Sequence, residues 1–387
     1  MADPTATKKS PSPGATSPKS GSGTASPPPA AAAAGGPSTA DPPPPPGRPA
    51  EATHTIDVDD DDATSDDGYG SSASVSAATT SISSSVRDST FENNRRYHKF
   101  REGRYQFPND EPEQEREDMK HAMIVHLCGG KLHFAPIDGE EDGRGGGGGG
   151  GVKDILDVGT GTGIWAIDVG DEYPEANVLG IDLSPIQPVW IPPNVSFMVD
   201  DAESEWLHGG ERFDYIHIRH MCSSIRNWRK LLEQAYRALR PGGWIELQEL
   251  RFVALCDDDT LAPDHVLPQL LGGVRDGLAA NGINLLDMEK NASRVRQAGF
   301  VGVDEKVFKT PVGTWPRNND MKKIGMYCRS MIYDGLHGIT MGPFTRGLRW
   351  TPEEVEVFLA KVRKGLLESR AHVYIPFHVV MGQKPRG

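Results

Sequence analysis

The sequence has 387 residues, a net charge of −13 and four cysteines, none of them in a Cys-x-x-Cys pair. The acidic charge argues against nonspecific binding to nucleic acid or to an anionic membrane, and the cysteine spacing gives no pattern of a zinc site or a disulfide framework. No apolar run approaches the roughly 20 residues that cross a bilayer, and the polar N-terminus resembles neither a secretory signal nor a transit peptide. We therefore expect a protein of the nucleus, the cytoplasm or both.

Residues 1–90 are rich in Pro, Ser, Ala, Thr and Gly and almost lack large apolar side chains. Such a segment cannot bury enough surface to offset its ordering entropy, so we expect a disordered tail. Within it, Ile56 precedes the acidic run 57–62. An apolar residue beside acids could add a strand to a partner's sheet edge, but a solvated run of charges is the simpler interpretation.

The folded part is expected over residues 91–387, with an N-terminal helical extension before the core. A helix is predicted over 111–128 with Asp110 as its cap, followed by a short extended stretch at 132–136. The glycine run 145–151 predicts a flexible loop just before the first core strand.

From residue 152 onward, apolar strand patterns alternate with helical ones. Strands are predicted at 154–158, 177–182, 195–199, 213–218 and 244–249, with helices at 164–172 and 228–239. Later helices are predicted at 263–282, 286–299, 321–336 and 352–369, and later strands at 301–308 and 372–381. This alternation predicts an α/β fold with a doubly wound, mostly parallel, Rossmann-like sheet and an antiparallel C-terminal edge.

A glycine-rich turn, Asp157-x-Gly159-x-Gly161-x-Gly163, stands where the first core strand passes into a helix. A nicotinamide dinucleotide site would have the pattern Gly-x-Gly-x-x-Gly, with the pyrophosphate at the helix N-terminus. Here the third glycine comes one residue early, and Asp157 precedes the first glycine by two. An acid at that position suits the ammonium group of a phosphate-free donor such as S-adenosylmethionine.

Acidic residues follow the next two strands. Asp182 ends the second strand, where a carboxylate can accept both hydroxyls of a ribose, and Asp201 follows the third, where it could accept the adenine amino group. At the end of the fourth strand, Arg219 could order the donor's carboxylate or pair with a structural acid. His220 is the candidate catalytic base, although a structural histidine fits as well. The expected donor-binding set is Asp157, Gly159, Thr160, Gly161, Gly163, Asp182, Leu183, Asp201, Ala202 and Arg219, and no metal ligands are expected.

Four stretches together resemble the fungal LaeA-like methyltransferases: 157–168, 180–188, 213–219 and 239–246. Stretches 97–105, 107–111 and 371–374 also fit, so the resemblance covers about residues 91–387. It implies a class I methyltransferase fold with a reversed final hairpin, and it places the donor against Gly159, Gly161, Gly163, Asp182 and the Asp201 region.

The family contains a global regulator of secondary metabolism, which is nuclear and works with velvet-domain proteins, together with paralogues of that regulator. Thr160 and the Arg219-His220-Met221 stretch depart from the regulator, which favours a paralogue. The resemblance therefore implies a methyltransferase that acts on an unidentified small metabolite or protein. The alternative is a nuclear regulatory subunit that binds the donor and velvet-type partners with little or no transfer of its own. For a base, Glu246, Glu249 and Tyr97 are further candidates, with strand-face or packing roles as the simpler interpretation.

Overall fold

The computed structural model describes residues 52, 55–58, 89–101, 105–138 and 151–387, which belong to one compact unit, residues 46–387. Most of the predicted tail and positions 145–150 of the glycine run lie outside the described residues. The described segment 55–58 contacts residues 316 and 317, far from it in the sequence. Val58 forms an antiparallel bridge with Pro316, and the Asp57 carbonyl accepts a hydrogen bond from the Arg317 N–H at 2.7 Å. The described part of this segment therefore forms one isolated β-bridge with its own chain, and strand addition to a partner stays a prediction.

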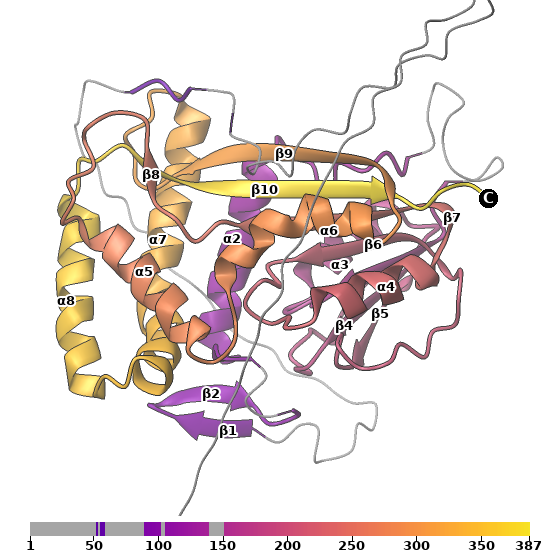
Figure 1. Ribbon diagram of the computed structural model, residues 1–387, viewed down its shortest axis with the longest axis horizontal. Helices are drawn as coiled ribbons and strands as arrows, with labels where there is room; N and C mark the ends of the chain where they lie inside the picture. The colour runs from indigo at the N-terminus through magenta and orange to yellow at the C-terminus, as the bar shows by residue number, and fades with distance from the viewer. Residues whose placement is uncertain (1–51, 53–54, 59–88, 102–104, 139–150) are drawn as a thin grey trace, which may run out of the picture. The chain divides into compact units, whose positions relative to one another are not determined.

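The central feature of the described residues is an eight-stranded sheet (Figure 1). Its parallel part has the order β5-β4-β3-β6-β7, formed by β3 (Asp154–Val158), β4 (Asn177–Asp182), β5 (Val195–Val199), β6 (Phe213–Arg219) and β7 (Leu239–Leu250). Antiparallel to β7 lies β10 (Val373–Gln383), which also pairs antiparallel with β8 (Leu255–Cys256) and β9 (Val301–Pro311). The predicted doubly wound sheet with an antiparallel edge is confirmed.

Helices surround this sheet. Two of them, α3 (Ile164–Glu172) and α4 (Trp228–Ala238), connect its parallel strands, and α6 (Asn291–Gln297) packs against β9 and β10. Further along the chain, α5 (Val266–Ala279), α7 (Asn319–Gly342) and α8 (Pro352–Glu368) pack on one another in a group at the left of Figure 1. The N-terminal α2 (Glu111–Leu127) packs against α7 and α3.

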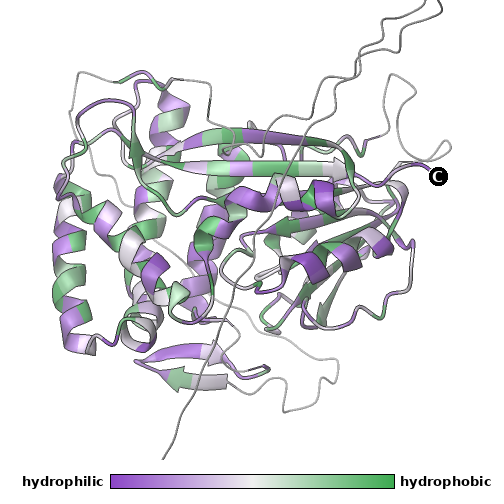
Figure 2. Cartoon of the chain, viewed as in Figure 1, coloured by the Kyte–Doolittle hydropathy of each residue, from purple (hydrophilic) through white to green (hydrophobic). Residues whose placement is uncertain are grey.

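The sequence of α8 shows why these helices form. Thr351 accepts a hydrogen bond from the N–H of Glu354, whose side chain accepts one from the Thr351 N–H, so the two residues form a capping box. Pro352 occupies the first turn, where its missing N–H costs nothing. The buried Val355, Leu359, Val362 and Leu366 recur at helical spacing, and α8 accordingly alternates between hydrophobic and hydrophilic colour in Figure 2.

Some local features of the structure differ from the sequence predictions. A hairpin of β1 (Ser89–Glu92) and β2 (Arg95–His98) precedes α2 and was not predicted. Its turn residues Asn93 and Asn94 both have positive φ, the conformation of a two-residue hairpin turn that asparagine tolerates. The helix predicted over 286–299 is a 3₁₀ helix (Leu285–Lys290) followed by α6. The stretch 132–136, predicted to be extended, belongs to no helix or strand. A π-helical turn (Pro343–Gly347) also extends the C-terminal end of α7.

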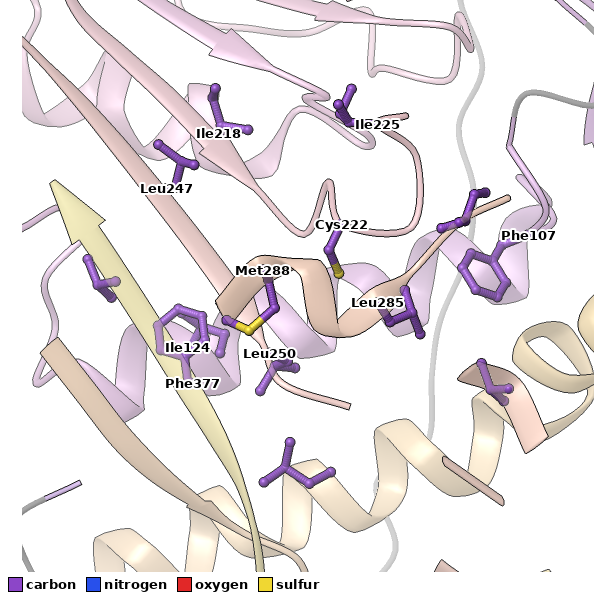
Figure 3. Close-up of a cluster of buried hydrophobic side chains, with 14 of the residues drawn as sticks. Phe107, Ile124, Ile218, Cys222, Ile225, Leu247, Leu250, Leu285, Met288 and Phe377 are labelled. Carbon is purple, nitrogen blue, oxygen red and sulfur yellow. The ribbon is translucent and has the colours of Figure 1, made fainter. Parts of the chain in front are cut away.

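The largest buried cluster joins the sheet to the helices around it. Figure 3 shows part of it: Ile218 comes from β6, Leu247 from β7, Ile124 from α2 and Phe377 from β10. Because segments distant in the sequence share this cluster, α2 and the C-terminal strands are held to the same sheet. In the part of the chain that the structure describes, no helix is both long and apolar enough to cross a membrane.

Candidate functional site

A cavity opens at the carboxyl ends of the parallel strands, the position where doubly wound sheets bind ligands. Its wall includes Gly159 and Gly161 after β3, Asp182 at the end of β4 and Asp201 after β5. The same wall continues past Arg219 and His220 at the end of β6 to Glu249 on β7. Residues predicted from separate motifs therefore meet in one cavity.

The three glycines of the turn do different things, although all have positive φ. A Cβ added at Gly159 would lie 2.2 Å from Sδ of Met221, so this glycine allows the cavity wall to pack closely. A Cβ at Gly161 would meet no atom within 4 Å, because this residue faces the open cavity. At Gly163 a Cβ would lie 2.4 Å from the ring of Phe197, away from the cavity lining. Only the first two glycines can approach a ligand.

Asp182 lies at the tip of β4 with both carboxylate oxygens engaged by backbone N–H groups. Oδ2 accepts from Gly161 and Oδ1 from Ser184, each at 2.9 Å. Burial raises the pKa of this carboxyl group, while the two N–H donors act in the opposite direction. Each carboxylate oxygen has a second lone pair, so the oriented group can still accept hydrogen bonds from hydroxyls in the cavity.

The region after β5 forms the neighbouring wall. One oxygen of Asp201 accepts a hydrogen bond from the Glu203 N–H at 2.9 Å, and the other lies 3.7 Å from Nε of Arg101. Ala202 and, after β4, Leu183 also line the cavity. The structure thus brings this predicted acid and its two apolar neighbours to the same wall as Asp182.

Asp157, Thr160 and Gly163 belong to the predicted donor set but do not line the cavity. Asp157 is buried and accepts a hydrogen bond from Nδ1–H of His217 at 2.8 Å, and the imidazole stacks on Trp165 with ring centroids 3.6 Å apart. Burial lowers the pKa of His217, which favours the neutral ring. In this structure Asp157 fixes the base of the glycine turn from the interior of the sheet.

Arg219 lies on the wall and donates a hydrogen bond to Nδ1 of His121 at 2.9 Å. His121 in turn donates from Nε2 to the carboxylate of Asp168 at 2.9 Å. Burial lowers the pKa of His121, so this hydrogen-bond partner is a neutral imidazole. The guanidinium therefore retains its charge and several N–H donors for an anionic group in the cavity.

His220, the predicted base, lines the cavity, and its buried Nε2 has no hydrogen-bond partner among the described residues. Burial, together with the nearby cations Lys120, Arg219 and Arg116, holds the pKa of His220 well below 6.5. The ring is therefore neutral at pH 7, but the same cations oppose its taking up a proton.

The further candidates Glu249, Glu246 and Tyr97 differ in their position relative to the cavity. Glu249 lines the cavity, whereas Glu246 and Tyr97 do not. Glu246 accepts hydrogen bonds from the N–H groups of Phe134 and Ala135, each at 2.8 Å, and so anchors that loop to the sheet. Tyr97 lies beneath the guanidinium of Arg346, 5.2 Å from the ring centroid, in a packing contact.

One wall of the cavity, formed by α2, was not predicted from the sequence. Its charged residues Glu113, Arg116, Glu117 and Lys120 all line the cavity and form ion pairs along the helix. Burial acts to raise the pKa of Glu117, but Lys120 and Arg116 outweigh it and lower this pKa to about 2. Their spacing of three and four residues places them on one helix face, a signal present in the sequence. The sequence does not show that this face turns inward.

Comparison with known proteins agrees with this architecture. A family profile described as "Methyltransferase domain" matches residues 119–305. Methyltransferase pytC of Aspergillus terreus is 40% identical over 310 residues, which cover 80% of this chain and 92% of that protein. Secondary metabolism regulator LAE1 of Cochliobolus heterostrophus is 38% identical over 298 residues, covering 76% of this chain and 94% of that protein.

This chain belongs to the fungal LaeA-like methyltransferase family. Another family member, the protein-methionine methyltransferase laeA of Emericella nidulans, is 32% identical over 299 residues, which cover 76% of each chain. The match to pytC is as close as that to the regulator, which fits the predicted paralogue. The comparisons also favour an enzyme over a regulatory subunit without transfer of its own.

The methyl donor predicted for this LaeA-like methyltransferase is S-adenosylmethionine. The residues of the cavity fit such a donor. Gly161 leaves open space beside the backbone, Asp182 is held as a preoriented acceptor, and Arg219 offers a cation. When bound, the donor supplies a methyl group on a positively charged sulfur, so the protein has mainly to position the acceptor and exclude water.

Proposed function

We propose that this LaeA-like methyltransferase holds the donor along the carboxyl ends of β3, β4 and β5. Asp182 accepts hydrogen bonds from the ribose hydroxyls, while Asp201 and Ala202 contact the adenine. The observation that carries this proposal is the carboxylate of Asp182, which faces the cavity and is fixed by the N–H groups of Gly161 and Ser184. This single group joins the glycine turn to the end of β4, where a nucleoside ribose would lie.

The amino-acid end of the donor extends toward β6. The backbone at Gly159 and Gly161 allows close approach, and Arg219 supplies a charge that is complementary to the donor's carboxylate. The remaining part of the cavity, over β6, β7 and β10, then receives the acceptor. The reaction that this arrangement supports is direct displacement at the methyl carbon.

Calorimetric titration of the full chain with S-adenosylhomocysteine, S-adenosylmethionine and NAD tests the proposal. We expect the first two to bind and NAD not to bind. Asp182→Asn keeps an oxygen for only one of the two backbone N–H groups, places an NH2 group against the other and removes the charge. The affinity for S-adenosylhomocysteine should therefore fall at least tenfold, about 1.4 kcal/mol.

A matched control is Asp171→Asn, which makes the same charge change at an exposed position of α3. It should leave the affinity within twofold of the unmodified protein. Unchanged affinity in Asp182→Asn would remove this residue from the donor site, and binding of NAD without S-adenosylhomocysteine would overturn the donor assignment.

For the biological setting, we propose a role in fungal secondary metabolism, in the nucleus, the cytoplasm or both, with velvet-type proteins as partners. The proposal is supported by the family relationship, in which relatives carry the name secondary metabolism regulator. A pull-down with the full chain as bait should retain velvet-type proteins, and localisation of a tagged chain tests the compartment. Failure to retain any velvet-type protein would argue against the partnership.

A further inference from the structure

The acceptor part of the cavity has a composition unlike that of the donor part. Its wall over β7 and β10 is formed by apolar side chains from several elements: Leu250, Phe252, Leu271 of α5, Met331 and Ile339 of α7, and Ile375 of β10. Such a wall suits an acceptor with an apolar, ring-sized body, because burying that surface favours binding.

Two polar groups interrupt the apolar wall at the ends of β6 and β7, His220 and Glu249. Glu249 is 1% exposed and lies beside the loop that follows β6. Its Oε1 accepts hydrogen bonds from the N–H groups of Met221 at 2.8 Å and Cys222 at 3.0 Å. Its Oε2 has no hydrogen-bond partner among the described residues. One oxygen is therefore anchored, while the other is buried, unsatisfied and part of a cavity-lining side chain.

An unsatisfied buried carboxylate oxygen is costly unless a ligand supplies the missing donor. Burial raises the pKa of Glu249 to about 7, so the group exchanges a proton near neutral pH. His220 is the competing base in the same region. Burial and the cations Lys120, Arg219 and Arg116 hold the pKa of His220 well below 6.5. Burial has the opposite effect on a carboxyl group, and it raises the pKa of Glu249 although the Cys222 thiol and Lys120 act to lower it, so Glu249 is the stronger base of the two. The electrostatics therefore favour the carboxylate as proton acceptor.

We propose that Glu249 is the general base of the transfer and that the acceptor is a phenolic or enolic hydroxyl on an apolar body. This inference rests on the proposed donor placement. A hydroxyl must lose its proton as it attacks, so it needs a base at hydrogen-bond distance. A thioether attacks through a free sulfur lone pair and needs no base, and a carboxylate acceptor would be repelled by Glu249.

The step balances without a further reactant. The acceptor oxygen forms a bond to the methyl carbon, and the carbon–sulfur bond breaks with its electron pair remaining on sulfur. Oε2 of Glu249 takes the hydroxyl proton and later releases it to water. The products are a methyl ether, S-adenosylhomocysteine and a proton. His220 acts as a positioning residue, because its unpartnered Nε2 can hydrogen-bond to the same acceptor oxygen.

The test uses the full chain and the isosteric variant Glu249→Gln, which keeps an oxygen for the two anchoring N–H groups but cannot take a proton. Glu233→Gln, the same change at an exposed position of α4, is the control. The probes are 2-naphthol, 4-hydroxycoumarin, 2-naphthyl methyl sulfide and an N-acetylated methionine amide. Transfer of radiolabelled methyl and the affinity for S-adenosylhomocysteine are both measured.

We expect methylation of a hydroxyl probe and of neither thioether. Glu249→Gln should lower kcat by about 10²- to 10⁴-fold while leaving the affinity for S-adenosylhomocysteine within twofold. The kcat of the unmodified protein should rise with an inflection near pH 7 that the variant lacks. Glu249→Asp, which retains a displaced carboxylate, should recover part of the rate.

The outcomes separate the two proposals. If S-adenosylhomocysteine does not bind the unmodified protein, the proposed donor site itself fails. If it binds but neither hydroxyl probe is bound or methylated, the acceptor class assigned to this cavity is wrong. If a thioether is methylated at a rate that Glu249→Gln does not change, Glu249 is not the general base and the acceptor is methionine-like. An unchanged kcat for a hydroxyl probe in Glu249→Gln would likewise exclude Glu249 as the base.

Discussion

Alanine substitution at two glycines of the same turn should affect stability and ligand binding in opposite order. Gly163→Ala should lose more stability, and Gly161→Ala should lose more ligand affinity. Both Gly161 and Gly163 have positive φ, so alanine at either position costs about 1 kcal/mol of backbone strain. Gly161→Ala adds a methyl group that meets no protein atom within 4 Å and projects into the cavity. Gly163→Ala places the methyl group 2.4 Å from a ring carbon of Phe197, which adds about 1–3 kcal/mol of overpacking.

Gly161→Ala should therefore lower the melting temperature by only about 3 °C, and Gly163→Ala by about 10 °C, at roughly 2–4 °C per kcal/mol for a domain of this size. For the affinity toward S-adenosylhomocysteine, the order of the two variants should be reversed. Gly161→Ala should bind S-adenosylhomocysteine at least tenfold more weakly, about 1.4 kcal/mol, because its methyl group occupies donor space. Circular dichroism during heating and calorimetric titration at a temperature where both variants are folded measure the two quantities.

The two measurements refute the reasoning in different ways. Normal ligand affinity in Gly161→Ala would mean that its open side does not face the donor. A loss of stability in Gly161→Ala as large as that in Gly163→Ala would mean that the turn is packed in a way these contacts do not describe.

The remaining predictions concern the two glutamates of β7. Glu246→Gln should destabilise the fold by about 2 kcal/mol in urea unfolding without changing ligand affinity, because the amide cannot satisfy Phe134, Ala135 and Gln248 together; an equally stable variant would contradict this role. For Glu249, burial raises the pKa from 4.5 to about 7, so the folded state retains a proton that the unfolded chain has lost. Its stability contribution is thus present below pH 4.5 and lost as the pH rises to about 7. Unfolding of the wild type and Glu249→Gln at pH 5 and pH 8 should show a relative gain by the variant of up to about 3 kcal/mol, and a pH-independent difference would argue against the raised pKa.

Much of the sheet followed from local pattern. The predicted strands 154–158, 177–182 and 195–199 have the bounds of β3, β4 and β5, because strands of a parallel sheet are buried on both faces and read as short apolar runs. The β1–β2 hairpin was missed although Asn93-Asn94 is a turn signal, since its strands are short and polar.

The site residues that could be predicted from the sequence are those at or just after the end of a strand. Asp182, Asp201, Arg219 and His220 come immediately after or at the end of parallel strands, and such ends meet at one edge of a sheet. The α2 wall was not predictable in this way, because its charged face would serve equally well in solvent. It is buried only because α2 packs against α3 and α7, segments far from it in the sequence.

The sequence by itself determined that this chain is a methyltransferase with its glycine turn after β3 and acids after β4 and β5, because these features depend on residues close together along the chain. The tertiary structure decided the rest. Asp157 turned inward to His217, although it stands at a position where it could have met a ligand. Glu246 and Glu249, three positions apart on one strand, point to opposite faces of the sheet, and only the packing of α2, α5 and α7 over one face made Glu249 part of a cavity.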